Sequence, residues 1–151
     1  MLKNQEKGKQ LLMFLATNYD ETAFDLVVST LKHTQTAVLI GGLTTAVIQG
    51  GYGQKQKPDY TISNLLKGTI TVAFDAVLLA GGVQSINHLF ADPRLHDLLT
   101  GYIAQGKRVG ICQPLPYKLI TSSPLFQTKQ VKVQNGESHR QFITRFLEAL
   151  P

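Results

Sequence analysis

The sequence contains one cysteine, Cys112, and a thiol is the strongest nucleophile among its side chains. A thiol attacks a carbonyl as the thiolate, which forms when a helix N-terminus, a cation or a base lies beside it. Cys112 ends a short apolar segment and is followed by Gln113. Carboxylates that could assist it, Asp20 and Glu21, follow the first apolar segment of the chain. The candidate catalytic residues are therefore Cys112 and Glu21, with Asp20 as a substitute for the acid.

A glycine pair, Gly81 and Gly82, follows another apolar segment and offers a second kind of site. Glycine adopts positive φ without steric cost, so the pair indicates first of all a turn between a strand and the next element. The alternative is a crevice for a small anion or an oxyanion, formed by Gly81, Gly82 and Gln113. The formal net charge of +5 would favour such an anion.

Other motifs predict little chemistry, and we expect no cofactor and no metal. The four histidines show no metal-ligand spacing, and we expect all four on the surface: His33, His88, His96 and His139. The glycine-rich segment 50–53 is not followed by a helix or by the Lys-Ser/Thr pair of a phosphate-binding loop. The basic stretches KNQEKGK and QKQK lack interleaved aromatic residues, so we expect no nucleic-acid partner.

The elements that would position these residues alternate between strands and helices. Continuous apolar runs, typical of strands covered on both faces, predict strands at 9–16, 36–42 and 74–80. Two further short strands are predicted at 107–112 and 130–133. Apolar residues at helical spacing predict a helix that buries Phe24, Val27, Val28 and Leu31, with Asn18 or Asp20 as its N-cap. Strand, helix and strand within the first 42 residues form a βαβ unit.

Two later helices are predicted, and the middle of the chain is less regular. Asp92 and Pro93 begin a helix that ends before Gly106, and a further helix spans 138–150. The segment 44–49 could form a strand, and 54–63 then returns as an extended antiparallel excursion at a sheet edge. Residues 115–120 could form one or two helical turns.

Length and composition limit the protein class. At 151 residues with 43% hydrophobic side chains, the chain fits a single domain over 1–151, and disorder is excluded. The lone cysteine excludes an internal disulfide, and no apolar run reaches the roughly 18 residues of a membrane span. We expect a cytoplasmic protein without a membrane partner, and Met1 with the polar start favours a stand-alone chain. The expected fold class is α/β, a three-layer α/β/α sandwich with a mostly parallel, flavodoxin-like sheet.

Three stretches together resemble a known family. FDAVLLAGG, a helix that begins at ADP, and GKRVGIC resemble the DJ-1/PfpI group of the class I glutamine amidotransferase-like superfamily. The stretch TISNLLKGTITVAFDAVLLAGGVQSINHL is similar to the DJ-1-like domain at the C-terminus of large-subunit catalases. The resemblance covers about residues 9–150, and its most specific part is 74–89. No haem-domain sequence is present, so the chain is not itself a catalase.

The nucleophile position departs from the family pattern. Active relatives carry Gly-Lys-Pro-x-x-x-x-Cys-His-Gly, and an ungapped count from Gly106 and Lys107 places their cysteine at Gln113. Cys112 comes one residue earlier, and side chains alternate along a strand, so it should turn into the packing of the sheet. Only a one-residue deletion in the strand would return Cys112 to the turn. The histidine that follows the family's cysteine is missing under either count.

The acidic position also departs from the pattern, because the last Glu of a Gly-Phe-Glu-x-x-Glu stretch corresponds to Ala23. Catalytic residues act as a unit, so the loss of two or three of them leaves little nucleophilic catalysis. The resemblance therefore implies a non-catalytic domain that acts in assembly, stabilisation or binding, as a homo-oligomer with a dimer as the expected form. Two alternatives remain open: a cysteine-dependent hydrolase or glyoxalase-like enzyme that uses Cys112, and a small-anion binding module.

Overall fold

The computed structural model describes residues 9–68, 73–115 and 123–150. Its centre is a sheet of six parallel strands in the order β5-β2-β1-β6-β7-β8. The strands are β1 Gln10–Phe14, β2 Ala37–Gly42, β5 Tyr60–Thr61, β6 Ala76–Leu79, β7 Arg108–Ile111 and β8 Val131–Val133. The five strands predicted at 9–16, 36–42, 74–80, 107–112 and 130–133 are therefore confirmed, each with shorter bounds.

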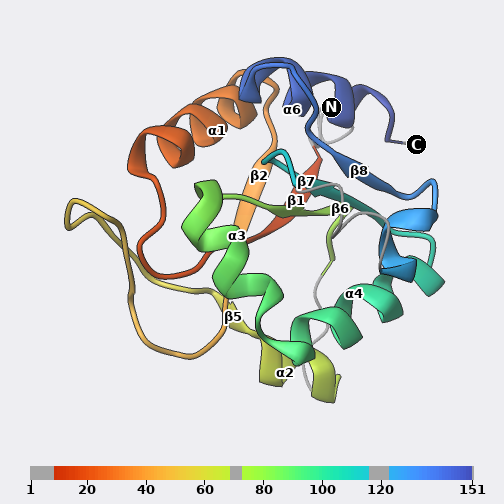
Figure 1. Ribbon diagram of the computed structural model, residues 1–151, viewed down its shortest axis with the longest axis horizontal. Helices are drawn as coiled ribbons and strands as arrows, with labels where there is room; N and C mark the ends of the chain where they lie inside the picture. Colours follow the sequence, from red (N-terminus) through yellow and green to blue (C-terminus); the bar gives the residue numbers. More distant parts are fainter. Residues whose placement is uncertain (1–8, 69–72, 116–122, 151) are drawn as a thin grey trace, which may run out of the picture.

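Helices cover both faces of the sheet, so the fold is the predicted three-layer α/β/α sandwich (Figure 1). One face carries α1 Glu21–His33 and α6 His139–Glu148, and the other carries α2 Ile62–Lys67, α3 Gly82–Phe90 and α4 Pro93–Ala104. A short 3₁₀ helix, η2, spans Pro124–Gln127. The strand order changes direction at β1: β2 lies on one side of β1, and β6 lies on the other side.

Each predicted helix has an N-cap residue whose side chain accepts a hydrogen bond from a backbone N–H group of the first turn. Asp20 caps α1 by accepting from the Ala23 amide, and Asp92 caps α4 with Pro93 in the first turn. Ser138 caps α6 and forms a capping box with Gln141. The apolar stripes of these helices complete two buried clusters, one on each face of the sheet.

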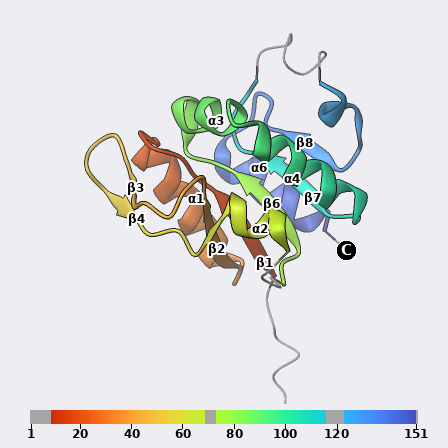
Figure 2. The same ribbon diagram turned by 90° about the horizontal axis from the view of Figure 1, so that it is seen from below.

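The middle of the chain differs from its prediction. Residues Ile48–Gln49 (β3) and Lys55–Gln56 (β4) form an antiparallel hairpin that is separate from the main sheet (Figure 2). The excursion predicted for 54–63 is therefore only partly antiparallel, since β5 joins the main sheet parallel to β2. Helix α2 follows β5 at once, because the Thr61 side chain accepts from the Asn64 amide and ends the extended segment.

Helix α3 was not expected, because the glycine pair that starts it indicated only a turn. The predicted turns at 115–120 lie outside the described residues except for Leu115. Among the described residues, no helix is both long enough and apolar enough to cross a membrane.

Candidate functional site

The loops that follow β1 and β6 are bound to each other at the carboxyl edge of the sheet, where open parallel sheets form their sites. The Asp20 amide donates to the Gly81 carbonyl oxygen at 2.8 Å, and the Ala16 amide donates to Ser85 Oγ at 3.0 Å. Ser85 Oγ donates in turn to the Ala80 carbonyl at 2.8 Å and is fully buried. The two loops therefore form one rigid wall.

A shallow hollow of about 530 Å³ lies against this wall, and we call it the carboxyl-edge crevice. It is lined by Asn18, Tyr19, Asp20, Glu21, Thr22, Gly51, Tyr52, Gly81, Val83 and Gln84. Gly81 and Gly82 have φ of 99° and 79°, which confirms the expectation of a turn with positive φ. Gly81 is the N-cap of α3 and supplies no side-chain cap. Gln113, the third residue predicted for an anion crevice, is not among the lining residues.

Glu21 contacts the hairpin and not the thiol. Its Oε2 accepts hydrogen bonds from the backbone amides of Tyr52 and Gln54, both at 2.8 Å. The Gln54 side chain extends this contact, since its Oε1 accepts from the Tyr19 hydroxyl at 2.6 Å. No described contact joins Glu21 to Cys112. Glu21 thus holds the turn of the hairpin in place beside the crevice.

Replacing Glu21 with alanine should loosen this turn. The two amides lose a charged acceptor, although water can reach them, so we expect a local cost of about 1 kcal/mol. Amide hydrogen exchange followed by NMR should then show the Tyr52 and Gln54 amides exchanging roughly fivefold faster. Glu148→Ala, which removes an exposed carboxylate from α6, should leave both rates unchanged. Equal exchange rates in wild type and Glu21→Ala would contradict the role assigned to Glu21.

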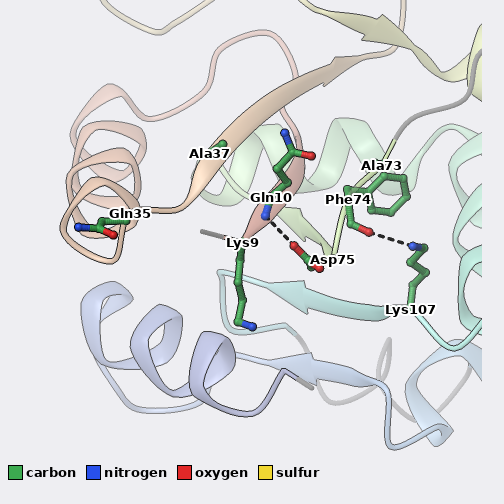
Figure 3. Close-up of a pocket in the computed structure, with 8 residues that line it drawn as sticks. All are labelled: Lys9, Gln10, Gln35, Ala37, Ala73, Phe74, Asp75 and Lys107. Carbon is green, nitrogen blue, oxygen red and sulfur yellow. Dashed lines mark hydrogen bonds between the residues drawn. The ribbon is translucent and has the colours of Figure 1, made fainter. Parts of the chain in front are cut away.

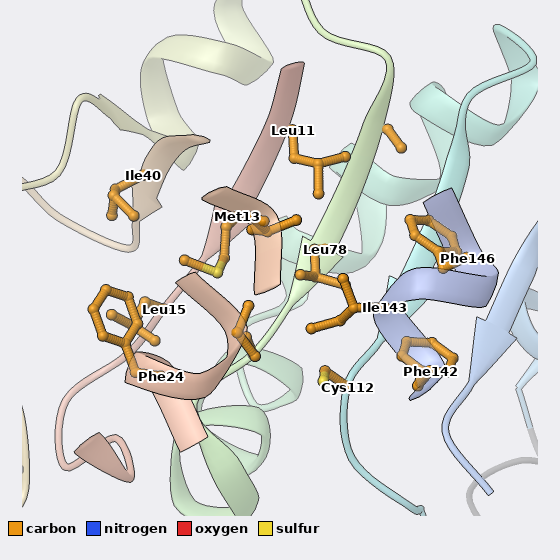
Figure 4. Close-up of a cluster of buried hydrophobic side chains, with 14 of the residues drawn as sticks. Leu11, Met13, Leu15, Phe24, Ile40, Leu78, Cys112, Phe142, Ile143 and Phe146 are labelled. Atoms are coloured by element: carbon orange, nitrogen blue, oxygen red, sulfur yellow. The ribbon is translucent and has the colours of Figure 1, made fainter. Parts of the chain in front are cut away.

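Cys112 lies directly after β7, and its side chain turns into the core. Its amide donates to the Leu79 carbonyl oxygen of β6 at 2.9 Å, and only 1% of the residue is exposed. Figure 4 shows the sulfur beside Ile143 and Phe142 of α6, in the buried cluster on that face. Burial, together with the nearby charge of Glu137, raises the pKa of the Cys112 thiol to about 12. The thiol is therefore protonated at neutral pH.

A histidine nevertheless contacts this thiol. The Nδ1 atom of His139, the first residue of α6, lies 3.4 Å from Cys112 Sγ and 2.8 Å from Gln134 Oε1. Gln134 is buried, and its Nε2 donates to the Glu137 carbonyl oxygen at 2.6 Å, which directs Oε1 toward the ring. Because an amide oxygen only accepts, Nδ1 carries the proton in this pair.

The direction of this hydrogen bond determines what the histidine can do. A ring nitrogen that already carries a proton cannot accept one from the thiol. His139 Nδ1 therefore acts as a donor toward Gln134 and Cys112, and it ties the start of α6 to the ends of β7 and β8.

The sequence-based prediction of four surface histidines is wrong for His139, which is partly buried; His33, His88 and His96 are exposed. The residue lies 27 positions after Cys112, and only the tertiary fold brings the two together. The sequence signals only the start of the helix, since Ser138 as an N-cap places His139 in the first turn of α6. The position of His139 beside the end of β7 is a tertiary contact. Among the described residues, no group of three or more His, Cys, Asp or Glu side chains could hold a metal ion.

Comparison with known proteins shows a likeness in structure only. The sequence matches no protein-family model and no curated protein. Drosophila melanogaster DJ-1beta is similar in structure, with a TM-score of 0.68 and 17% identity over 95% of this chain and 90% of that chain. A DJ-1 superfamily protein from Agrobacterium tumefaciens gives a TM-score of 0.69 and 11% identity over 93% and 89%.

Other solved structures match over a shorter length. Toxoplasma gondii DJ-1 gives a TM-score of 0.56 and 20% identity over 68% of this chain, and the match spans 54% of that chain. The match to the VC2308 protein, with 24% identity and a TM-score of 0.57, spans 69% of this chain and 52% of that one. This chain thus spans about half the length of these two proteins. These matches show that the chain has the DJ-1/PfpI-like α/β fold.

Proposed function

We propose that this chain is a non-catalytic DJ-1/PfpI-like domain that acts in assembly, stabilisation or binding. The observation that carries the proposal is the state of Cys112: buried, protonated, and in contact with a histidine nitrogen that donates a hydrogen bond. A cysteine nucleophile needs access to its substrate and a group that removes its proton. Cys112 has neither, and Glu21 is already bound to the hairpin.

The resemblance to the catalase-appended domain points in the same direction. It rests on residues 61–89, and the most specific part, 74–89, forms the end of the loop before β6, the strand itself and most of α3. A domain of this kind, present in a reduced cytoplasmic compartment, would act through contacts on its surface and not by catalysis. Two properties test the proposal: the reactivity of the Cys112 thiol and the size of the particle that the chain forms.

A cysteine-dependent hydrolase or glyoxalase-like enzyme is the second candidate, and one observation favours it. A Cys-His contact of 3.4 Å is the arrangement that activates thiols in many enzymes. For His139 to act as the base, the Gln134 amide would have to turn and give up its bond to the Glu137 carbonyl. The core over Cys112 would also have to open. This candidate therefore requires a conformation that differs from the described one.

Assembly is supported by the apolar side chains that are exposed around the carboxyl-edge crevice. Tyr52, in the turn of the hairpin, is 93% exposed, and Val83, in the first turn of α3, is 55% exposed. Both line the crevice, and the hairpin extends beyond the main sheet (Figure 2). Exposed aromatic side chains are enriched at protein interfaces. We propose that this region is the contact surface of a homodimer.

Sedimentation velocity should find wild-type protein at twice the mass of the 16.6 kDa chain at micromolar concentration. Tyr52→Ser should raise the dimer dissociation constant by at least tenfold, because it removes the most exposed aromatic ring among the described residues. Leu66→Ser, which removes an exposed apolar side chain from α2, is the matched control and should leave the dimer intact. A wild-type monomer at all concentrations would refute the assembly role.

A further inference from the structure

One cavity of the molecule holds polar groups that are already matched within the chain. It has a volume of about 620 Å³ and lies where β1, β2, β6 and β7 begin (Figure 3). Lys107 Nζ donates to the Phe74 carbonyl oxygen at 2.8 Å, and Asp75 Oδ2 accepts from the Gln10 amide at 2.7 Å. Asp75 also lies between Lys9 and Lys107, so the charges of this cavity offset one another. Reactive groups without partners lie elsewhere, in the turn between β8 and α6.

This turn contains an Asn-Gly pair, Asn135 and Gly136, and both residues are exposed. In the part of the chain that the structure describes, the Asn135 side chain has no hydrogen-bond partner and the Gly136 amide donates to no acceptor. Gly136 has φ of 72°, and a Cβ added there would meet no atom within 4 Å. The fold therefore neither covers these two groups nor holds them in a hydrogen bond.

We propose that Asn135 deamidates spontaneously, and that the isoaspartyl form releases the contact between His139 and Cys112. The Gly136 backbone nitrogen loses its proton to hydroxide and attacks Asn135 Cγ. A bond from nitrogen to Cγ forms, the bond from Cγ to Nδ2 breaks, and ammonia leaves a cyclic succinimide. Water then opens the ring at either carbonyl, which gives an aspartyl or an isoaspartyl residue, and nothing is oxidised or reduced. Glycine has no side chain to shield its nitrogen from this ring closure.

Two other exposed asparagines provide an internal comparison. Asn64 lies in α2 and Asn87 lies in α3, and each precedes a larger residue, Leu65 or His88. Inside a helix the backbone amide of the following residue donates to a carbonyl oxygen four positions earlier, which holds its nitrogen away from the side chain. We therefore expect deamidation at Asn135 and not at these two positions.

The consequence for the thiol follows from the contacts across the turn. Gln134 Nε2 donates to the Glu137 carbonyl oxygen at 2.6 Å, and Gln134 Oε1 accepts from His139 Nδ1 at 2.8 Å. An isoaspartyl linkage adds one carbon to the main chain between Gln134 and Glu137, so it lengthens the span that the Gln134 amide bridges. The new carboxylate also lies near that of Glu137, whose Oε2 accepts from the Asn135 amide at 3.2 Å, and like charges repel. Both changes loosen the 3.4 Å contact between His139 and Cys112.

Peptide mapping of protein incubated at pH 8 for several weeks tests the first step. Trypsin cleaves after Lys132 and Arg140, and the peptide 133–140 should gain about 1 Da as an amide becomes an acid. The peptides that contain Asn64 and Asn87 should keep their mass. Methylation by protein isoaspartyl methyltransferase with labelled S-adenosylmethionine measures the isoaspartyl share.

Iodoacetamide labelling tests the second step. The deamidated form carries one more negative charge, so cation exchange separates it from fresh protein, and its Cys112 should react about fivefold faster. Because two forms of the same chain are compared, the outcome does not depend on dimer formation or on the absolute reactivity of the thiol.

Variants connect the two steps. Asn135→Ser removes the side-chain amide and should abolish both the mass gain and the faster labelling. Asn87→Ser is the matched control, since it removes another exposed asparagine, and it should retain both effects. Equal mass gains at Asn135 and Asn87, or equal labelling rates for fresh and isoaspartyl protein, would overturn the inference.

Discussion

Iodoacetamide should leave Cys112 unmodified in the folded protein at pH 8 and should modify it rapidly once guanidinium unfolds the chain. The pKa of the thiol is about 12 in the fold instead of its ordinary 9.0, so the thiolate fraction falls roughly a thousandfold. Burial of the sulfur lowers the rate further, because the reagent must reach it. Intact-mass spectrometry against time gives both rates, and their ratio should be at least a thousand.

The control is a thiol placed on the surface of the same fold. Ser29→Cys, made together with Cys112→Ser, puts the thiol on an exposed position of α1 and should react at the rate of a free cysteine. His139→Ala distinguishes the two functions of the histidine. If His139 were a base, its loss would slow the reaction of Cys112; as a hydrogen-bond donor that holds α6, its loss should leave the rate equal or faster. Fast labelling of wild type that slows in His139→Ala would replace the proposal with a cysteine enzyme.

The strands and three of the helices could be predicted because local pattern and tertiary environment agree there. The strand β6, for example, is apolar at every position, as a strand covered on both faces must be. Helix α4 has its N-cap Asp92, Pro93 in the first turn, and a buried stripe at helical spacing. Helix α3 escaped prediction because it starts at Gly82 with no side-chain cap and because glycine is a poor helix former. Only the packing of its buried face explains why it forms.

The candidate site could be predicted in part. The one-residue offset from Gly106 implied that Cys112 points into the core, and its burial confirms this. The partner of the thiol could not be inferred, because Gln134 and His139 reach it from β8 and α6 through tertiary packing. Whether Cys112 and Glu21 ever act together stays a prediction, as does the anion crevice at Gly81. Long-range contacts of this kind have no periodic signal in the sequence.

Gly81→Ala should be among the most destabilising single substitutions in the chain. Its φ of 99° costs a residue with a side chain about 1–2 kcal/mol. A Cβ there would lie 2.7 Å from Leu15 Cδ1 and 2.8 Å from Ser85 Oγ, and both neighbours are fully buried. Crowding of a packed core adds roughly 1–3 kcal/mol. We expect a total loss of about 2–5 kcal/mol, measured as a lower midpoint of guanidinium unfolding.

Two other glycines divide this loss into its causes. Gly53 has φ of 95°, and a Cβ added there would meet no atom within 4 Å, so Gly53→Ala should show the backbone cost alone, about 1–2 kcal/mol. Gly101 lies within α4 at an ordinary helical conformation with open space around it, and Gly101→Ala should stabilise by up to about 1 kcal/mol. If Gly81→Ala lowers the free energy of unfolding no more than Gly53→Ala does, Ser85 and Leu15 can shift to make room for the added methyl group. The carboxyl edge of the sheet would then be soft enough to remodel around a ligand, contrary to the rigid wall described for it.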